Sequence, residues 1–149
     1  MAAWTPLKAP RPAEPVRGWN EQGCPFYAAG AVYRQEFQVP KGAGRYLISV
    51  PDWYGSVAKV TVNGKPAGHL VSRPWEIDVT GQIQAGANVV EVLVIGTLKN
   101  TLGPHHAGKL RGAAGPSEFR QGPPGQPPGA AYDTIEYGLF APFALMQCI

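Results

Sequence analysis

The stretch Val57–Val71, VAKVTVNGKPAGHLV, decides the fold class that the sequence predicts. Val60 and Val62 alternate with polar neighbours, which is the pattern of a strand with one buried face. Asn63-Gly64 follows at once, and both residues tolerate the positive φ angles of a tight hairpin turn. The stretch therefore predicts a β-hairpin.

Further strand-like segments lie on both sides of this hairpin. In residues 32–39, Tyr33, Phe37 and Val39 share one face of an extended chain, and charged or amide side chains occupy the other. Residues 89–96, VVEVLVIG, form a nearly continuous apolar run, which is expected for a strand covered on both faces. No segment shows convincing helical periodicity. The other expected strands are residues 45–50, 75–79 and 139–147, and residues 84–88 are expected to form a turn.

The composition agrees with an all-β domain. The chain has 149 residues, enough for one domain, and its 19 Gly and 16 Pro suit short strands joined by turns. We expect a single β-sandwich over residues 19–149, after a Pro-rich extended lead-in over residues 1–18 that Trp4 and Trp19 pack onto the sandwich. Residues 104–131 are rich in Gly and Pro, and we expect a long loop that is mobile at its centre and anchored at both ends.

Charge and cysteine usage exclude several classes of partner. The net charge of +3 is spread without a basic run, so nucleic acid is not an expected partner. No stretch approaches the ~20 apolar residues of a membrane helix, and no membrane partner is expected. Cys24 and Cys148 lack metal-ligand spacing, so neither a metal nor another cofactor is expected. The two cysteines form either one disulfide or two free thiols.

Three ordered pieces of the sequence resemble the sugar-binding domain of glycoside hydrolase family 2. They are VYRQEFQVP (32–40), VAKVTVNGKPAG (57–68) and WEIDVTGQIQAGANVVEVLV (75–94). Two further pieces, GTLKNTLGPHH (96–106) and YGLFAPFAL (137–145), resemble C-terminal sandwich domains of large bacterial glycoside hydrolases, including rhamnosidase-type enzymes. The resemblance implies a galactose-binding-like jelly roll that accompanies other glycoside hydrolase domains. In that enzyme class the catalytic carboxylates lie in a separate barrel domain.

Aromatic and hydrogen-bonding side chains in the loops are the candidate sugar-binding residues. Aromatic faces cover the apolar side of a sugar ring, and Trp53, Tyr54 and Trp75 lie in loops or at strand starts, where packing at the edge of the fold is their alternative role. Arg73 could donate hydrogen bonds beside Trp75. His105 and His106, at the mouth of the long loop, could bind sugar hydroxyls or anchor the loop. Because adjacent residues of an extended chain point in opposite directions, this pair does not suit one metal ion.

Carboxylates could support catalysis if two of them flanked a glycosidic bond. We expect Asp78 and Glu91 to be structural or solvated, because they lie in predicted strands. The chain's candidate carboxylates are Asp52, Glu76, Asp78, Glu91, Glu118, Asp133 and Glu136.

The sequence thus favours a non-catalytic carbohydrate-binding module of a glycoside hydrolase that acts on plant or microbial polysaccharide. The alternatives are a structural domain that supports its parent enzyme without binding sugar, and a small enzyme in its own right. Residues 1–18 lack the apolar core of a secretory signal, so either the chain stays inside the cell or it is part of a longer protein. We favour the second, as a part of a larger secreted or periplasmic enzyme.

Overall fold

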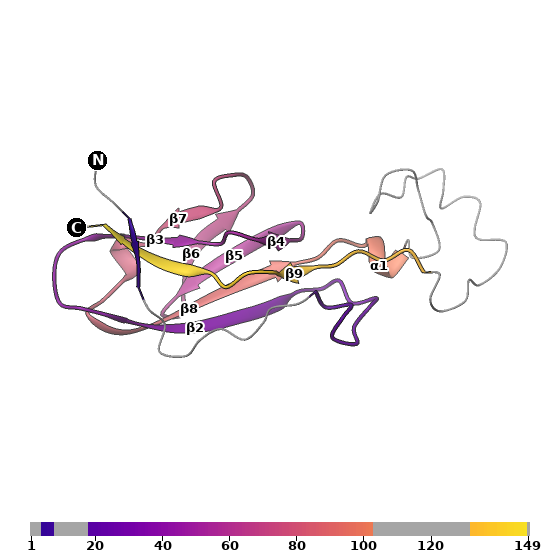
Figure 1. The fold of residues 1–149 in the computed structure, drawn as a ribbon, viewed down its shortest axis with the longest axis horizontal. Helices are drawn as coiled ribbons and strands as arrows, with labels where there is room; N and C mark the ends of the chain where they lie inside the picture. The colour runs from indigo at the N-terminus through magenta and orange to yellow at the C-terminus, as the bar shows by residue number, and fades with distance from the viewer. Residues whose placement is uncertain (1–3, 8–17, 103–131, 149) are drawn as a thin grey trace.

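The computed structural model describes residues 4–7, 18–102 and 132–148, and almost all of its regular structure is β (Figure 1). The short helical elements are a 3-10 turn at Thr80–Gln82 and α1 at Lys99–Leu102, which the sequence did not predict. The strands are β1 (Thr5–Pro6), β2 (Ala31–Val39), β3 (Arg45–Ser49), β4 (Trp53–Tyr54), β5 (Val57–Val62), β6 (Lys65–Leu70), β7 (Glu76–Asp78), β8 (Gly86–Ile95), β9 (Gly138–Leu139) and β10 (Ala144–Cys148).

The strands form a sandwich of two antiparallel sheets. One sheet has the order β1-β10-β3-β7 and the other the order β2-β8-β5-β6, while β4 and β9 pair separately. The pairs are nested along the chain: β1 with β10, β2 with β8, β3 with β7, and β5 with β6. This nesting over eight strands is the arrangement of a jelly roll. The all-β sandwich predicted from the sequence is confirmed.

The hairpin that opened the sequence argument forms as predicted. Asn63 has a φ of 51° and Gly64 a φ of 76°, which are the positive angles that a two-residue turn between β5 and β6 requires. On β5 the side chains of Ala58, Val60 and Val62 are fully buried. On β2, Phe37 and Val39 are buried, while the alternating residues Arg34, Glu36 and Gln38 are exposed. Inward-facing residues of both sheets make one hydrophobic core.

Two strand predictions were wrong in detail. On β8, Val90, Val92 and Val94 are fully buried, but the alternate residues are only half-buried, because no described strand or helix forms a second layer over the outer face of this antiparallel sheet. The segment 139–147 is not one strand: it divides into β9, which pairs with β4, and β10, which pairs with β3. Pro142 lies in the break, where its fixed φ and missing N–H do not interrupt a ladder. The turn predicted at 84–88 is shorter, since β8 already begins at Gly86.

The start of the chain contributes to the sandwich. β1 is an edge strand on β10, and the Leu7 amide donates to the Leu145 carbonyl. An edge position tolerates Pro6, which has no N–H to donate. Trp19 belongs to the core, with 5% of its surface exposed, whereas Trp4 is exposed.

Asn88 is a buried polar residue whose hydrogen bonds join the start of β8 to the turn that follows β5. Its side chain is fully buried, donates to the carbonyls of Gln84 and Gly86, and accepts from the Gln84 amide and from Asn63 Nδ2. Asn63 Oδ1 accepts from the Val89 amide. Turn geometry alone, which the sequence suggested for Asn88, therefore does not account for this residue.

The described residues that flank the long loop are tied together. Lys99 Nζ lies 2.7 Å from Asp133 Oδ2, and the Lys99 side chain is 3% exposed. The Asn100 side chain donates to the Ile135 carbonyl and accepts from the Ile135 amide. The described residues on either side of 103–131 are thus joined, while the predicted loop, with its anchored ends and mobile centre, lies outside the described residues.

Cys24 and Cys148 are both free thiols. Cys24 is exposed in the turn that follows Trp19, and Cys148 is buried at the end of β10, where it pairs with Arg45. The disulfide that the sequence left open is therefore not formed. In the described part of the chain, no helix has the length and apolar character needed to cross a membrane.

Asn88→Ala should lower the free energy of unfolding by at least about 2 kcal/mol, because several buried backbone and side-chain groups lose their partners together. Urea denaturation measures the loss. Gln84→Ala is the matched control, since the Gln84 side chain is exposed and makes one long hydrogen bond of 3.4 Å. Equal stability of the two variants would contradict the central role of Asn88.

Asp133→Ala should destabilise the fold by about 3 kcal/mol, because it removes a carboxylate that lies 2.7 Å from a buried ammonium group. Lys99→Met should cost less, since the Asp133 side chain that remains is 24% exposed. Glu36→Ala serves as the control, because it removes an exposed ion pair with Arg34. If Asp133→Ala and Glu36→Ala unfold at the same urea concentration, the ion pair at the base of the loop does not stabilise the fold.

Candidate functional site

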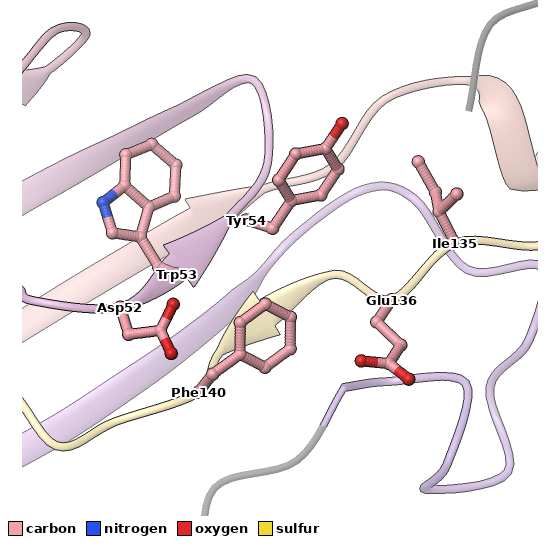
Figure 2. Close-up of a pocket in the computed structure, with 6 residues that line it drawn as sticks. All are labelled: Asp52, Trp53, Tyr54, Ile135, Glu136 and Phe140. Atoms are coloured by element: carbon pink, nitrogen blue, oxygen red, sulfur yellow. The ribbon is translucent and has the colours of Figure 1, made fainter. Parts of the chain in front are cut away.

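A surface pocket of about 380 Å³ lies beside the short β4–β9 pair. Figure 2 shows its walls, which come from two segments far apart in the sequence. The lining residues are Asp52, Trp53, Tyr54, Ile135, Glu136 and Phe140.

Backbone hydrogen bonds hold the two walls side by side. The Asp52 carbonyl accepts from the amides of Phe140, at 2.9 Å, and Ala141, at 3.3 Å. In β4 and β9, Trp53 is opposite Leu139 and Tyr54 is opposite Gly138. The pocket is therefore built on paired main chain and not on the ends of free loops.

The Tyr33 hydroxyl lies behind this pair and connects three segments. It accepts from Trp19 Nε1 at 3.0 Å and from the Leu139 amide at 3.2 Å. The Trp19 amide in turn donates to the Tyr137 carbonyl. Gly138 lies between Tyr137 and Leu139 in the chain. It has a φ of 126°, and a Cβ there would lie 2.5 Å from the Tyr33 hydroxyl oxygen. Only glycine fits this position, so close packing fixes β9 against β2.

Tyr54 is the most open aromatic ring of the pocket. It stacks on Tyr137 with ring centres 5.9 Å apart and an interplanar angle of 12°, and it remains 50% exposed. Tyr137 beneath it is 1% exposed, and its hydroxyl is hydrogen-bonded to the Thr97 hydroxyl. Burial raises the pKa of Tyr137, so this supporting ring stays uncharged. A buried neutral ring therefore supports an exposed one.

Trp53 combines packing with a place in the pocket wall. Its ring meets that of Trp75 edge to face, with centres 5.1 Å apart, and both side chains pack against the core. Trp53 Nε1 is buried and has no hydrogen-bond partner among the described residues.

Of the sequence-predicted binding residues, the structure brings Trp53 and Tyr54 into one pocket. Trp75 contacts the Trp53 ring edge to face, and the exposed Arg73 lies in the connection between β6 and β7. Neither residue lines the pocket. His105 and His106 lie outside the described residues. A sugar-binding role for these four residues stays a prediction.

From the sequence alone, Asp52 and Glu136 were expected only as members of a possible catalytic pair, and Phe140 only as part of a strand. Their place in the pocket was not predicted. The local signal was an acid next to or near an aromatic residue in both segments, 52–54 and 136–140. The pairing of β4 with β9, which joins the segments, has no local signal.

The pocket can accept hydrogen bonds and can cover an apolar surface. Asp52 and Glu136 are exposed carboxylates, which accept from hydroxyl groups, and Tyr54 and Phe140 supply aromatic faces. The six lining residues include no Lys, Arg or His. Among the described residues no group of three or more His, Cys, Asp or Glu could hold a metal ion.

Solved structures of glycoside hydrolases contain a domain of this fold. A rhamnosidase from Novosphingobium sp. PP1Y gives a TM-score of 0.56 at 23% identity, over 82% of this chain and 11% of that chain. A β-glucuronidase from Bifidobacterium dentium gives a TM-score of 0.55 at 18% identity, over 97% of this chain and 28% of that chain. An FMN-binding β-glucuronidase from Facaelibacterium prausnitzii L2-6 gives a TM-score of 0.54 at 21% identity, over 98% and 21%.

Sequence comparison agrees with the structural likeness. A protein of Formosa agariphila named as a β-glucuronidase is 32% identical over 93 residues, which are 58% of this chain and 8% of that protein. The predicted resemblance to glycoside hydrolase domains is confirmed. No family model matches the chain. The chain spans at most 28% of the length of these relatives, so it corresponds to a small part of large glycoside hydrolases.

Gly138→Ala should lower the free energy of unfolding by about 2 kcal/mol or more, because its Cβ requires a strained φ and displaces the Tyr33 hydroxyl. Urea denaturation and the near-UV circular dichroism of the aromatic residues are the measurements. Gly81→Ala is the matched control, since nothing lies within 4 Å of a Cβ at that position. If both variants were as stable as the parent protein, β9 would not depend on the contact between Gly138 and Tyr33.

Proposed function

We propose that this chain is a non-catalytic carbohydrate-binding domain of a larger glycoside hydrolase, and that its ligand binds in the pocket between β4 and β9. The observation that carries the proposal is the half-exposed Tyr54 ring, which is stacked on the buried Tyr137 and lines the same pocket as two exposed acidic residues. A sugar presents an apolar ring face together with hydroxyl donors, and this pocket offers a partner for each.

The size and openness of the pocket suit recognition of a surface sugar unit. A volume of about 380 Å³ lies at the lower end of the range for ligand pockets. Preorganised aromatic rings lose little conformational freedom on binding, which favours affinity at a shallow site. A non-catalytic role agrees with the share of its relatives that the chain spans, at most 28%.

A second candidate function, support of a neighbouring domain, is favoured by a different surface. Phe26 and Leu98 are 44% and 64% exposed. They belong to segments that are joined through Thr101, whose hydroxyl donates to the Phe26 carbonyl and whose amide donates to the Leu98 carbonyl. Tyr27, next to Phe26, is also exposed. Exposed apolar side chains that gather in this way are common at partner surfaces.

Tyr54→Ala should weaken sugar binding at least about tenfold, because truncation of an aromatic anchor commonly costs 2 kcal/mol or more. Affinity electrophoresis against a panel of soluble plant and microbial polysaccharides identifies the ligand, and isothermal titration with its oligosaccharides measures the dissociation constant. Phe26→Ala is the matched control, since it removes an aromatic ring of similar exposure outside the pocket.

The two candidate functions give opposite results with these variants. If the chain binds sugar in the pocket, polysaccharide in the gel no longer retards Tyr54→Ala, whereas it retards Phe26→Ala as it does the parent protein. If neither the parent protein nor Phe26→Ala is retarded by any polysaccharide, the binding proposal fails. The supporting role then gains weight if Phe26→Ala weakens the association of the domain with the rest of its enzyme in size-exclusion chromatography.

A further inference from the structure

The charge of the pocket limits which sugars it can hold. Asp52 and Glu136 both contribute carboxylates to its wall, and the six lining residues include no cationic side chain. In the described part of the chain, neither acid belongs to an ion pair. Among the described residues, therefore, no cationic side chain compensates the two negative charges at the pocket.

The main chain fixes the positions of both acids. Asp52 is held through its carbonyl, which accepts two amides from the opposite segment. Both chain neighbours of Glu136 are held by hydrogen bonds. The Ile135 amide donates to the Asn100 side chain, which in turn donates to the Ile135 carbonyl, and the Tyr137 carbonyl accepts from the Trp19 amide. The main chain thus holds both residues at the pocket, which keeps their carboxylates near a ligand bound there.

Gly18 limits Glu136 from a further side. A Cβ at Gly18 would lie 2.9 Å from Glu136 Cβ, so segment 18–20 packs directly against the stem of this side chain. The carboxylate end remains exposed. The Cβ of Glu136 is thus packed against segment 18–20, while its carboxylate is exposed.

We infer that this pocket discriminates between sugars by charge: it binds amino sugars more tightly than neutral sugars and rejects uronic acids. A uronate would add a third carboxylate to a pocket that already has two, and such juxtaposition is unfavourable even in a partly hydrated site. An ammonium group of an amino sugar would donate to the same oxygens with charge assistance. The inference rests on the proposed function and specifies the ligand class of the same pocket.

Two series of oligosaccharides that differ only in charge test the inference. One consists of β-1,4-linked glucosamine, glucose and glucuronate oligomers, and the other of the galacto-configured equivalents. Isothermal titration at low salt should give dissociation constants that rise from amino to neutral to acidic sugar, with at least about a fivefold difference between neutral and acidic forms. The differences should shrink at high salt, because exposed charges are screened.

Variants assign the selectivity to the two acids. The double variant Asp52→Asn/Glu136→Gln should bring the ratio of acidic to neutral affinity close to one. Glu36→Gln, which removes an equal charge from an exposed position on β2, should leave the ratio as in the parent protein. Circular dichroism checks that each variant is folded.

The outcomes separate this inference from the proposed function. If uronate oligomers bind as tightly as neutral ones, or if the double variant keeps the parent ratio, the charge selectivity is overturned while sugar binding stands. If no member of either series binds while the polysaccharide panel retards the protein, the proposed ligand class is overturned and sugar binding stands; if the panel also fails, the binding function is overturned too.

Discussion

The hydroxyl group of Tyr33 is the contact on which the functional end of this domain depends. It is the common acceptor for the Trp19 indole and the Leu139 amide, so a single oxygen joins β2, the segment before it and β9. β9 in turn carries one wall of the pocket and pairs with the strand that carries the other. Because β4 and β9 have two residues each, their own hydrogen bonds could not define this geometry without support from behind.

That arrangement divides the aromatic residues into two roles. Trp19 and Tyr137 are buried and hydrogen-bonded, and they give the site rigidity. Tyr54 is stacked on Tyr137 and half exposed, which gives it a contact surface at little loss of side-chain freedom. Trp53 is intermediate, since its edge-to-face contact with Trp75 belongs to the core while it also lines the pocket. The same cluster thus serves folding and recognition.

The sequence predicted the sandwich well because its evidence was local. Alternation in β2 and β5 and the positive-φ turn at Asn63-Gly64 depend on neighbours in the chain. The pocket could be predicted only in part: Trp53 and Tyr54 were expected in a binding loop, but Glu136 and Phe140 reach them through a pairing of segments some eighty residues apart. Asn88, expected only as part of a turn, was misjudged for a related reason, since it also contacts Asn63 in the distant turn between β5 and β6.

The contacts Lys99–Asp133 and Asn100–Ile135 join the two described segments that flank residues 103–131. Once the two ends are joined, lengthening the connection adds only a slowly growing entropy of closure, about 0.6 kcal/mol for each doubling of its length. Natural variants of this domain can therefore differ widely in the size of that connection while they keep one core. For protein engineering, a foreign peptide or a second domain can be inserted between these two joined ends with little effect on stability.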